Sequence, residues 1–300
     1  MKKVAISIGD LNGIGIEIAL KAHDKIKTKI TPIYCINKTM LQKASKLLKT
    51  PIPDDFQIVE VEGNFEINPG KVDAKSGEYS YKSFLKAIDL AKNKKVDAIT
   101  TLPINKEAWN KARIKYKGHT EVLRDIFKKE AIMMLGCEKM YVALYTEHIP
   151  LKEVPSKIKK EKLIKFFLDF YKSTKFEKIG VLALNPHAGD GGVLGDEEIK
   201  EISPAIIQAN KILNLQIFYG PLVPDIAFTA KKGVFIAMYH DQGLAPLKAL
   251  YFEESINVSL NLPILRTSVD HGTAFDIAYQ GKANTKSYEN AIEYILKRKS

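Results

Sequence analysis

The sequence predicts an α/β fold in which helices cover both faces of a mainly parallel β-sheet. Apolar runs of strand character alternate with amphipathic helical patterns along almost the whole chain, and this alternation is typical of successive β-α-β units. The 300 residues are 45% hydrophobic, which suffices for a substantial core and for two lobes around a cleft. No repeat period or low-complexity linker appears, so we treat residues 1–300 as one unit whose lobe boundary the sequence does not mark.

The expected elements follow one another in a regular order. Strands are expected at residues 4–9, 32–37, 96–103, 142–146, 179–185, 235–240 and 256–263. Helices are expected at residues 14–26, 40–48, 80–93, 163–172, 199–213 and 287–298. The segment from 51 to 77 is rich in turn-forming residues, which predicts a hairpin or an excursion at the edge of the sheet.

Composition excludes several classes of protein. Cys35 and Cys137 lie in apolar runs without a CxxC pair, which indicates reduced core residues of a cytoplasmic protein. The N-terminal apolar stretch soon meets Asp10 and lacks a cleavage site, so we read it as a strand, and no run is long enough to span a membrane. The net charge of +11 is mostly lysine spread over helix faces, without a nucleic-acid-binding signature, so we expect no nucleic-acid or membrane partner.

A glycine-rich stretch lies between the first strand and the first helix, where dinucleotide-binding folds carry G-x-G-x-x-G. Gly13 and Gly15 match the first two positions, but Ile18 occupies the third. The second strand ends in Asn37 instead of the acid that would bind a ribose. The fingerprint therefore fails, and the glycines indicate either a tight turn or a close approach to a ligand in another binding mode.

Three histidines directly follow strand-like runs and precede turns that contain proline or glycine. They are His148 in MYVALYTEHIPL, His187 in GVLALNPHAGDGG and His240 in FIAMYHDQGLAPLK. The carboxyl ends of parallel strands meet at one edge of a sheet, so these imidazoles are expected to lie near each other. A hydrogen-bonded loop histidine is the ordinary explanation for any one of them. Three in the same context favour a divalent metal with positions open for water or substrate.

Acidic and basic side chains in the same turns are candidates for proton transfer. Asp225 in LVPDIAF, Asp241 beside His240 and Lys248 at the end of that segment could each act as the base, and the sequence does not choose among them. His23 lies in the first expected helix among lysines and is most simply a surface residue.

An anion site is expected from KGHTEVLRDIF and from Arg266. Thr120 follows His119 immediately before an amphipathic pattern and is expected to cap that helix, whose free N–H groups attract phosphate or carboxylate. Arg266 leaves an apolar run and needs an anionic partner, which is either a bound oxyanion or a structural ion pair. Lys248 and Asn257 could complete the surroundings of such an anion.

With these segments in view, the sequence resembles the 4-hydroxythreonine-4-phosphate dehydrogenase family of vitamin B6 biosynthesis. The matching stretches are GDLNGIGIE, GHTE, NPHAGDGG, MYHDQGLAPLK and NLPILRTSVDHGTAFDIA, which run in the family's order over essentially the whole chain. The resemblance implies a two-lobed α/β/α sandwich of the isocitrate/isopropylmalate dehydrogenase-like type, with the active site in the inter-lobe cleft. That fold has no G-x-G-x-x-G loop, which agrees with the failed fingerprint.

The resemblance also implies an activity. It is oxidation of 4-phosphooxy-L-threonine by NAD or NADP, followed by loss of carbon dioxide to give 3-amino-2-oxopropyl phosphate. The implied enzyme is a homodimer whose subunits share the active site, with a divalent metal, usually zinc and otherwise magnesium or cobalt. The implied metal ligands are His148, His187 and His240. The implied substrate contacts are His119, Thr120, Lys248, Asn257 and Arg266.

The sequence departs from the family pattern at three places, and one alternative with the same scaffold and metal-binding histidines also stays open. GDLNG, Asp190 and LAPLK stand where many relatives have GDPAG, glutamate and LPVLK or LIPLK, and these changes bear on loop shape and cofactor preference. The alternative is a sister dehydrogenase acting on 4-phospho-D-threonate, on the corresponding erythronate or on a cis-dihydrodiol. Turnover of these substrates side by side would separate the two.

Overall fold

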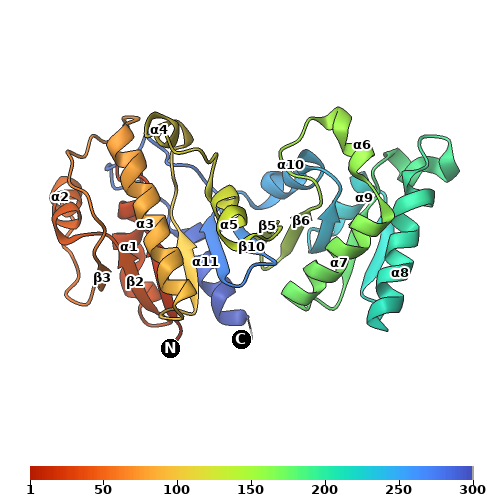
Figure 1. Cartoon of the computed structure of the whole chain (residues 1–300), viewed down its shortest axis with the longest axis horizontal. Helices are drawn as coiled ribbons and strands as arrows, with labels where there is room; N and C mark the ends of the chain where they lie inside the picture. Colours follow the sequence, from red (N-terminus) through yellow and green to blue (C-terminus); the bar gives the residue numbers. More distant parts are fainter. Residues whose placement is uncertain (299–300) are drawn as a thin grey trace. The chain divides into compact units, whose positions relative to one another are not determined.

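The computed structural model describes residues 1–298, which divide into two compact units (Figure 1). The first unit comprises residues 1–129 and most of the C-terminal part, namely 256–258 and everything from 262 onward. The second comprises residues 130–255 together with 259–261. The second unit is thus an insertion between two segments that build the first.

The first unit contains a parallel sheet with the strand order β3-β2-β1-β4-β11. The strands are β1 (Lys3–Ser7), β2 (Thr31–Cys35), β3 (Ile58–Val59), β4 (Ala98–Thr101) and β11 (Leu265–Val269). The segment from 51 to 77 is an excursion that adds β3 to the edge parallel to β2, and it does not form a hairpin. Every residue of β4 is buried, so side chains cover both faces of the sheet at its centre.

Six helices of the first unit lie within the described residues. They are α1 (Gly15–Ile26), α2 (Lys38–Leu48), α3 (Ala74–Lys92), α4 (Lys106–Lys111), α5 (His119–Phe127) and α11 (Lys286–Lys297). The long helix α3 contacts β1, β2 and β4, whereas α11 contacts β4, β11 and α1. Asp73 caps α3 by accepting hydrogen bonds from the N–H groups of Lys75 and Ser76.

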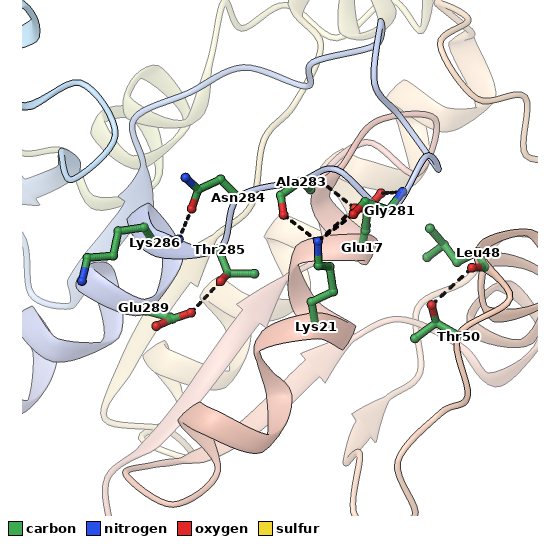
Figure 2. Close-up of polar contacts among 10 residues, drawn as sticks. All are labelled: Glu17, Lys21, Leu48, Thr50, Gly281, Ala283, Asn284, Thr285, Lys286 and Glu289. Atoms are coloured by element: carbon green, nitrogen blue, oxygen red, sulfur yellow. Dashed lines mark hydrogen bonds and ion pairs between the residues drawn. The ribbon is translucent and has the colours of Figure 1, made fainter.

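Helix α1 also holds the chain segment that leads into α11 (Figure 2). The buried carboxylate of Glu17 accepts hydrogen bonds from the N–H groups of Gly281 at 3.3 Å and Ala283 at 2.8 Å. Lys21, one turn further along, donates to the carbonyl oxygens of the same two residues at 3.0 and 2.9 Å. The two side chains therefore pair with both donors and acceptors of a segment without regular structure, in which Ala283 is buried and Gly281 is exposed.

The second unit contains a mixed sheet with the strand order β5-β6-β9-β7-β8. The strands are β5 (Ile132–Cys137), β6 (Met140–Leu144), β7 (Ile179–Leu182), β8 (Phe218–Leu222) and β9 (Gly233–Ala237). β5 and β6 form an antiparallel hairpin, while the remaining neighbours are parallel. β10 (Ile256–Leu260) has residues in both units. The expectation of a mainly parallel α/β sheet is confirmed.

Helices of the second unit cover its sheet. They are α6 (Val154–Lys157), α7 (Lys160–Thr174), α8 (Ser203–Leu213), α9 (Pro224–Ala227) and α10 (His240–Tyr251), with short η1 (Leu151–Glu153), η2 (Pro186–Gly192), η3 (Glu198–Ile202) and η4 (Phe228–Ala230). α7 and α8 lie side by side, and α10 packs on β5, β6 and β9 (Figure 1). No helix within residues 1–298 is both long enough and apolar enough to cross a membrane.

Candidate functional site

At the glycines of the stretch after β1, the space that a side chain would need is occupied by backbone atoms from other parts of the chain. A Cβ atom at Gly9 would lie 2.3 Å from the carbonyl oxygen of Pro103, and one at Gly13 would lie 2.8 Å from that of Thr273. At Gly15 the close neighbour is the carbonyl oxygen of Ile8, at 2.6 Å. These distances are too short for a side chain, so the glycines are explained by a tight turn and close chain packing. Nothing in them calls for a phosphate.

Asn37, which ends the second strand where a ribose-binding acid would stand, has a structural role. Its side-chain oxygen accepts a hydrogen bond from the N–H of Met40 and so caps α2. Its Nδ2 donates to the carbonyl oxygens of Val61 and Gly63, both at 2.7 Å. The residue is thus occupied in holding the excursion beside β2.

The three candidate metal-binding histidines follow three neighbouring parallel strands of the second unit. His148 follows β6, His187 follows β7 and His240 follows β9. β9 pairs in parallel with β6 on one side and with β7 on the other. The predicted placement at one edge of one sheet therefore agrees with the strand order.

His148 and His240 come close to each other. Their ring centroids are 5.4 Å apart and the ring planes are tilted by 42°. Asp241 accepts a hydrogen bond from Nδ1 of His240 at 2.6 Å, which leaves Nε2 of that ring as the atom able to bind a metal. His240 is the first residue of α10, where we expected a loop. Within the described part of one chain, no three or more His, Cys, Asp or Glu side chains are grouped to hold a metal ion.

His187 lies in a segment of unusual backbone conformation. From His187 to Gly191 five consecutive residues have positive φ, between 44° and 81°. A left-handed turn of this length is costly for residues with a side chain, so neighbouring groups must hold it in place. The segment is flanked by exposed apolar side chains: Val193 is 80% exposed, Leu194 46%, Ile199 55%, and Ile226, on α9 beside η2, 63%.

The expected anion-binding residues His119 and Arg266 are in contact in the first unit. Nη2 of Arg266 lies 3.3 Å from Nδ1 of His119. The guanidinium is buried, and this burial lowers its pKa to about 9, so Arg266 still carries its charge at neutral pH. Burial, and secondarily the charge of Arg266, holds the pKa of His119 well below its usual range, so this imidazole is neutral.

Two of the expected substrate-binding residues carry buried polar atoms without a hydrogen-bond partner among the described residues. One is Nε2 of His119 and the other is the side-chain oxygen Oδ1 of Asn257 in β10. An unsatisfied buried donor or acceptor costs about 1–3 kcal/mol, and such atoms are characteristic of places where a ligand completes the hydrogen bonding. Both residues are therefore suited to contact a polar substrate.

The remaining candidates have less distinctive surroundings. Thr120 lies in the first turn of α5, which begins at His119 with Gly118 as N-cap, so its expected role as the cap is wrong. Lys248 lies in the last turn of α10 with its ammonium 5.9 Å from the ring centre of Phe252. Asp225 is exposed at the start of α9.

The sequence did not reveal two residues, Thr101 and Glu198, that contact the candidate site residues or the segments carrying them. It also gave the wrong environment for a third residue, His23. Thr101 accepts hydrogen bonds from Arg266, and Glu198 holds the segment before His187. His23 is fully buried, between the hydroxyl of Tyr34 at 3.0 Å and Asp55 at 3.1 Å, so its prediction as a surface residue is wrong. Helical spacing places His23 on the apolar face of α1 with Ala19 and Ile26, and this spacing could have predicted that His23 is buried.

Comparison with known proteins identifies the family. The family model described as pyridoxal phosphate biosynthetic protein PdxA matches residues 18–295. The chain belongs to the PdxA family. A curated 4-hydroxythreonine-4-phosphate dehydrogenase of Sulfurimonas denitrificans is 63% identical over 298 residues, covering 98% of this chain and 97% of that protein. The chain is therefore a dehydrogenase of the PdxA type, acting in pyridoxal phosphate biosynthesis as a 4-hydroxythreonine-4-phosphate dehydrogenase.

Solved structures agree with the PdxA assignment. The crystal structure of 4-hydroxythreonine-4-phosphate dehydrogenase from Klebsiella pneumoniae is 32% identical, with a TM-score of 0.81 over 98% of this chain and 97% of that one. A β-decarboxylating dehydrogenase from Thermococcus kodakarensis is 13% identical, with a TM-score of 0.52 over 97% of this chain and 81% of that one. The second likeness concerns the fold alone, and with it the predicted isocitrate/isopropylmalate dehydrogenase-like architecture is confirmed.

Proposed function

We propose that this PdxA protein oxidises the secondary alcohol of 4-phosphooxy-L-threonine with NAD or NADP as hydride acceptor. The alcohol loses its proton to a base and its hydride to the nicotinamide ring. The product, 2-amino-3-oxo-4-phosphooxybutanoate, then loses carbon dioxide to give 3-amino-2-oxopropyl phosphate. The support is family membership together with the chemistry of the candidate residues.

The observation that carries the metal-dependent part of this proposal is the closeness of His148 and His240. Two imidazoles with ring centres 5.4 Å apart, one of them oriented by a carboxylate on Nδ1, fit two ligands of one divalent ion. His187 would be the third ligand. Zinc, the metal favoured by an all-nitrogen set, or otherwise magnesium or cobalt, would act as a Lewis acid on the alcohol oxygen when bound.

The third ligand is best supplied by a second copy of the chain. One chain brings only His148 and His240 together within its described residues, while His187 lies among the exposed side chains of Val193, Leu194, Ile199 and Ile226. Apolar side chains gathered at an exposed site favour a protein–protein contact. We therefore propose a homodimer in which this apolar patch is buried and each metal is held by histidines of both subunits.

Arg266, His119, Thr120, Asn257 and Lys248 are the proposed substrate contacts. Arg266 supplies positive charge for an anionic group of the substrate, and Lys248 supplies a second positive charge if Asp225, and not Lys248, is the base. Nε2 of His119 and Oδ1 of Asn257 supply a buried donor and a buried acceptor that no described residue satisfies. Fixing the substrate at both charged ends would determine which carbon faces the nicotinamide ring.

For the base, the surroundings of the three candidates differ. Asp241 already accepts a hydrogen bond from His240, and we propose that it orients that imidazole. Asp225 and Lys248 are then the candidates for proton abstraction. Replacing each in turn, as Asp225→Asn and Lys248→Met, should remove the acidic limb of the pH–rate profile in one variant only.

The close backbone contacts account for Gly9, Gly13 and Gly15 without a bound nucleotide, so these glycines do not support a nicotinamide site at the turn after β1. A cytoplasmic location is proposed from the two cysteines, Cys35 and Cys137, which are both buried and unpaired.

The experiment combines elemental analysis of the purified protein with reduction of NAD and NADP on 4-phosphooxy-L-threonine. We expect bound zinc, cobalt or magnesium and reduced cofactor formed with this substrate in preference to 4-phospho-D-threonate. His187→Ala should stay folded and lose both metal and oxidation. Retained turnover by His187→Ala after chelation would contradict the metal role, and preference for the phosphothreonate would establish the sister activity.

The dimer has a separate test. Val193→Glu places a charge in the apolar patch and should shift the protein to monomer in light scattering and reduce its metal content. Leu47→Glu, at a 47% exposed position of α2 in the first unit, is the matched control and should remain dimeric. A dimeric Val193→Glu protein with full metal content would place the contact elsewhere.

A further inference from the structure

Thr101, the last residue of β4, lies on the same face of the sheet as Arg266. β4 and β11 pair in parallel, with Ile99 opposite Arg266. Side chains two residues apart on a strand project to one face, so Thr101 is the diagonal neighbour of the arginine. Thr101 is fully buried, and Arg266 is only 3% exposed.

Two hydrogen bonds join these residues. Nε of Arg266 lies 3.1 Å and Nη2 lies 2.6 Å from Oγ1 of Thr101. A guanidinium has only donors, so the threonine oxygen accepts both bonds. The two bonds fix the plane of the guanidinium, which would otherwise rotate about the end of a flexible side chain.

The position of that plane determines the hydrogen-bonding state of His119. The second N–H of Nη2 points to Nδ1 of His119 at 3.3 Å, and since the guanidinium cannot accept, Nδ1 must be the unprotonated nitrogen. A neutral imidazole then carries its proton on Nε2. This Nε2 is buried and has no acceptor in the described chain, with the rings of Phe84 and Trp109 at 4.5 and 5.7 Å from the imidazole.

We propose that Thr101 is a positioning residue for anion binding. By holding the guanidinium of Arg266, it keeps His119 in the tautomer that presents an N–H donor to an oxyanion. The inference rests on the proposed function, because that function makes His119 and Arg266 contacts of a phosphorylated substrate. In this role Thr101 acts through Arg266 and needs no contact of its own with the substrate.

The test compares Thr101→Val, which keeps the shape and removes the acceptor, with Thr101→Ser, which keeps the oxygen. Thr100→Val is the matched control, since Thr100 is equally buried on the same strand but bonds to Thr267 at 2.9 Å. Protein labelled with ¹⁵N-histidine reports the tautomer of His119 by NMR, assigned with a His119→Gln variant. Titration with inorganic phosphate and steady-state kinetics on 4-phosphooxy-L-threonine complete the set.

We expect Thr101→Val to lose the pure Nε2–H signature of His119 and to bind phosphate about tenfold more weakly, with KM raised by a similar factor and kcat nearly unchanged. Thr101→Ser should keep the His119 tautomer, the phosphate affinity and the KM of the parent protein, and Thr100→Val should do the same. If the valine variant does not fold, Thr101→Cys, with its weak acceptor, should show a smaller shift in the same direction.

Unchanged His119 signals and phosphate affinity in Thr101→Val, or equal losses in Thr100→Val, would overturn the proposal. Failure of the proposed function is recognised separately. In that case the parent protein does not oxidise the phosphothreonine substrate, while the tautomer and phosphate measurements still decide the role of Thr101.

Discussion

The carboxylate of Glu198 accepts hydrogen bonds from both the main-chain N–H and the side-chain amide of Asn185, at 2.8 and 3.0 Å. It also accepts from the N–H of Leu184 at 2.7 Å. Glu198 is buried, and it satisfies the backbone where the chain leaves β7 and enters the left-handed segment that carries His187. One carboxylate thus fixes the starting point of that segment.

Glu198→Gln tests the role of these hydrogen bonds to the Glu198 carboxylate. The glutamine amide would face the amide of Asn185 donor to donor, so we expect the free energy of unfolding to fall by about 1–3 kcal/mol. Zinc content should fall as well, because His187 loses its fixed position. Urea denaturation and elemental analysis measure the two effects. Glu197→Gln is the control, since Glu197 is partly exposed and accepts a hydrogen bond from the Asn185 side chain at 2.7 Å. An equal effect there would rule out a special role for Glu198.

Gly189→Ala should destabilise the protein much more than Gly191→Ala. Both glycines have positive φ, 81° and 66°, so the backbone cost of a side chain is similar, about 1 kcal/mol. A Cβ at Gly189 would also lie 2.8 Å from Oε2 of Glu198, whereas a Cβ at Gly191 meets nothing within 4 Å. Urea unfolding midpoints of the two variants measure the difference in stability. Equal midpoints would contradict the close approach of Glu198 to Gly189.

Asp10 predicts a pH dependence of stability. Burial raises the pKa of this carboxyl to about 6, against the lowering effect of hydrogen bonds from Ser76 and Asn12. The folded state binds this proton more tightly than the unfolded chain does. Protonation of Asp10 therefore contributes fully to the free energy of unfolding below about pH 4, and this contribution is lost as the pH rises through 6.

Asp10→Asn removes that titration. We expect its stability relative to the parent protein to increase by about 1 kcal/mol between pH 5 and pH 8, measured by urea unfolding at both pH values. Asp54→Asn replaces an exposed carboxylate of the same unit and should follow the parent at both. A constant difference between Asp10→Asn and the parent would show that Asp10 does not titrate in this range.

Lys21→Met should loosen the segment that α1 holds (Figure 2). The substitution removes two charge-assisted hydrogen bonds, to the carbonyl oxygens of Gly281 and Ala283, and we expect faster amide exchange there and a loss of about 1–2 kcal/mol. Lys25→Met is the control, since Lys25 is 65% exposed and forms an ion pair with Glu289 on the protein surface. Equal amide exchange rates around Gly281 and Ala283 in the two variants would show that Lys21 does not stabilise this segment.

Most of the fold could be predicted because its signals are local. The alternation of strand-like runs with helical patterns identified β1, β2, β4, β6, β7, β9 and β10, and the apolar stripes identified α1, α7 and α11. α10 was missed because Gly243 and Pro246 interrupt its sequence, and its stability comes from packing. A Cβ at Gly243 would lie 2.5 Å from Val142, so the glycine lets the helix approach the sheet closely. That reason lies in tertiary contacts, which local patterns do not record.

The candidate site was predictable to the level of strand ends. The positions of His148, His187 and His240 after parallel strands followed from the pattern, because parallel strands share an edge. The contacts that orient the side chains did not follow. Thr101 and Arg266 are 165 residues apart, and nothing in the strand ending at Thr101 marks its hydroxyl as an acceptor for a guanidinium. Long-range pairs of this kind leave no local periodicity.

The insertion of the second unit into the first affects how the chain emerges during synthesis. β4 lies between β1 and β11, but β11 belongs to the C-terminal segment and is translated only after the whole of the second unit. Until then one side of β4 presents unpaired N–H and C=O groups, an edge prone to wrong pairing. The order of translation therefore lets the inserted unit fold before β11 is available to pair with β4 and complete the sheet of the first unit.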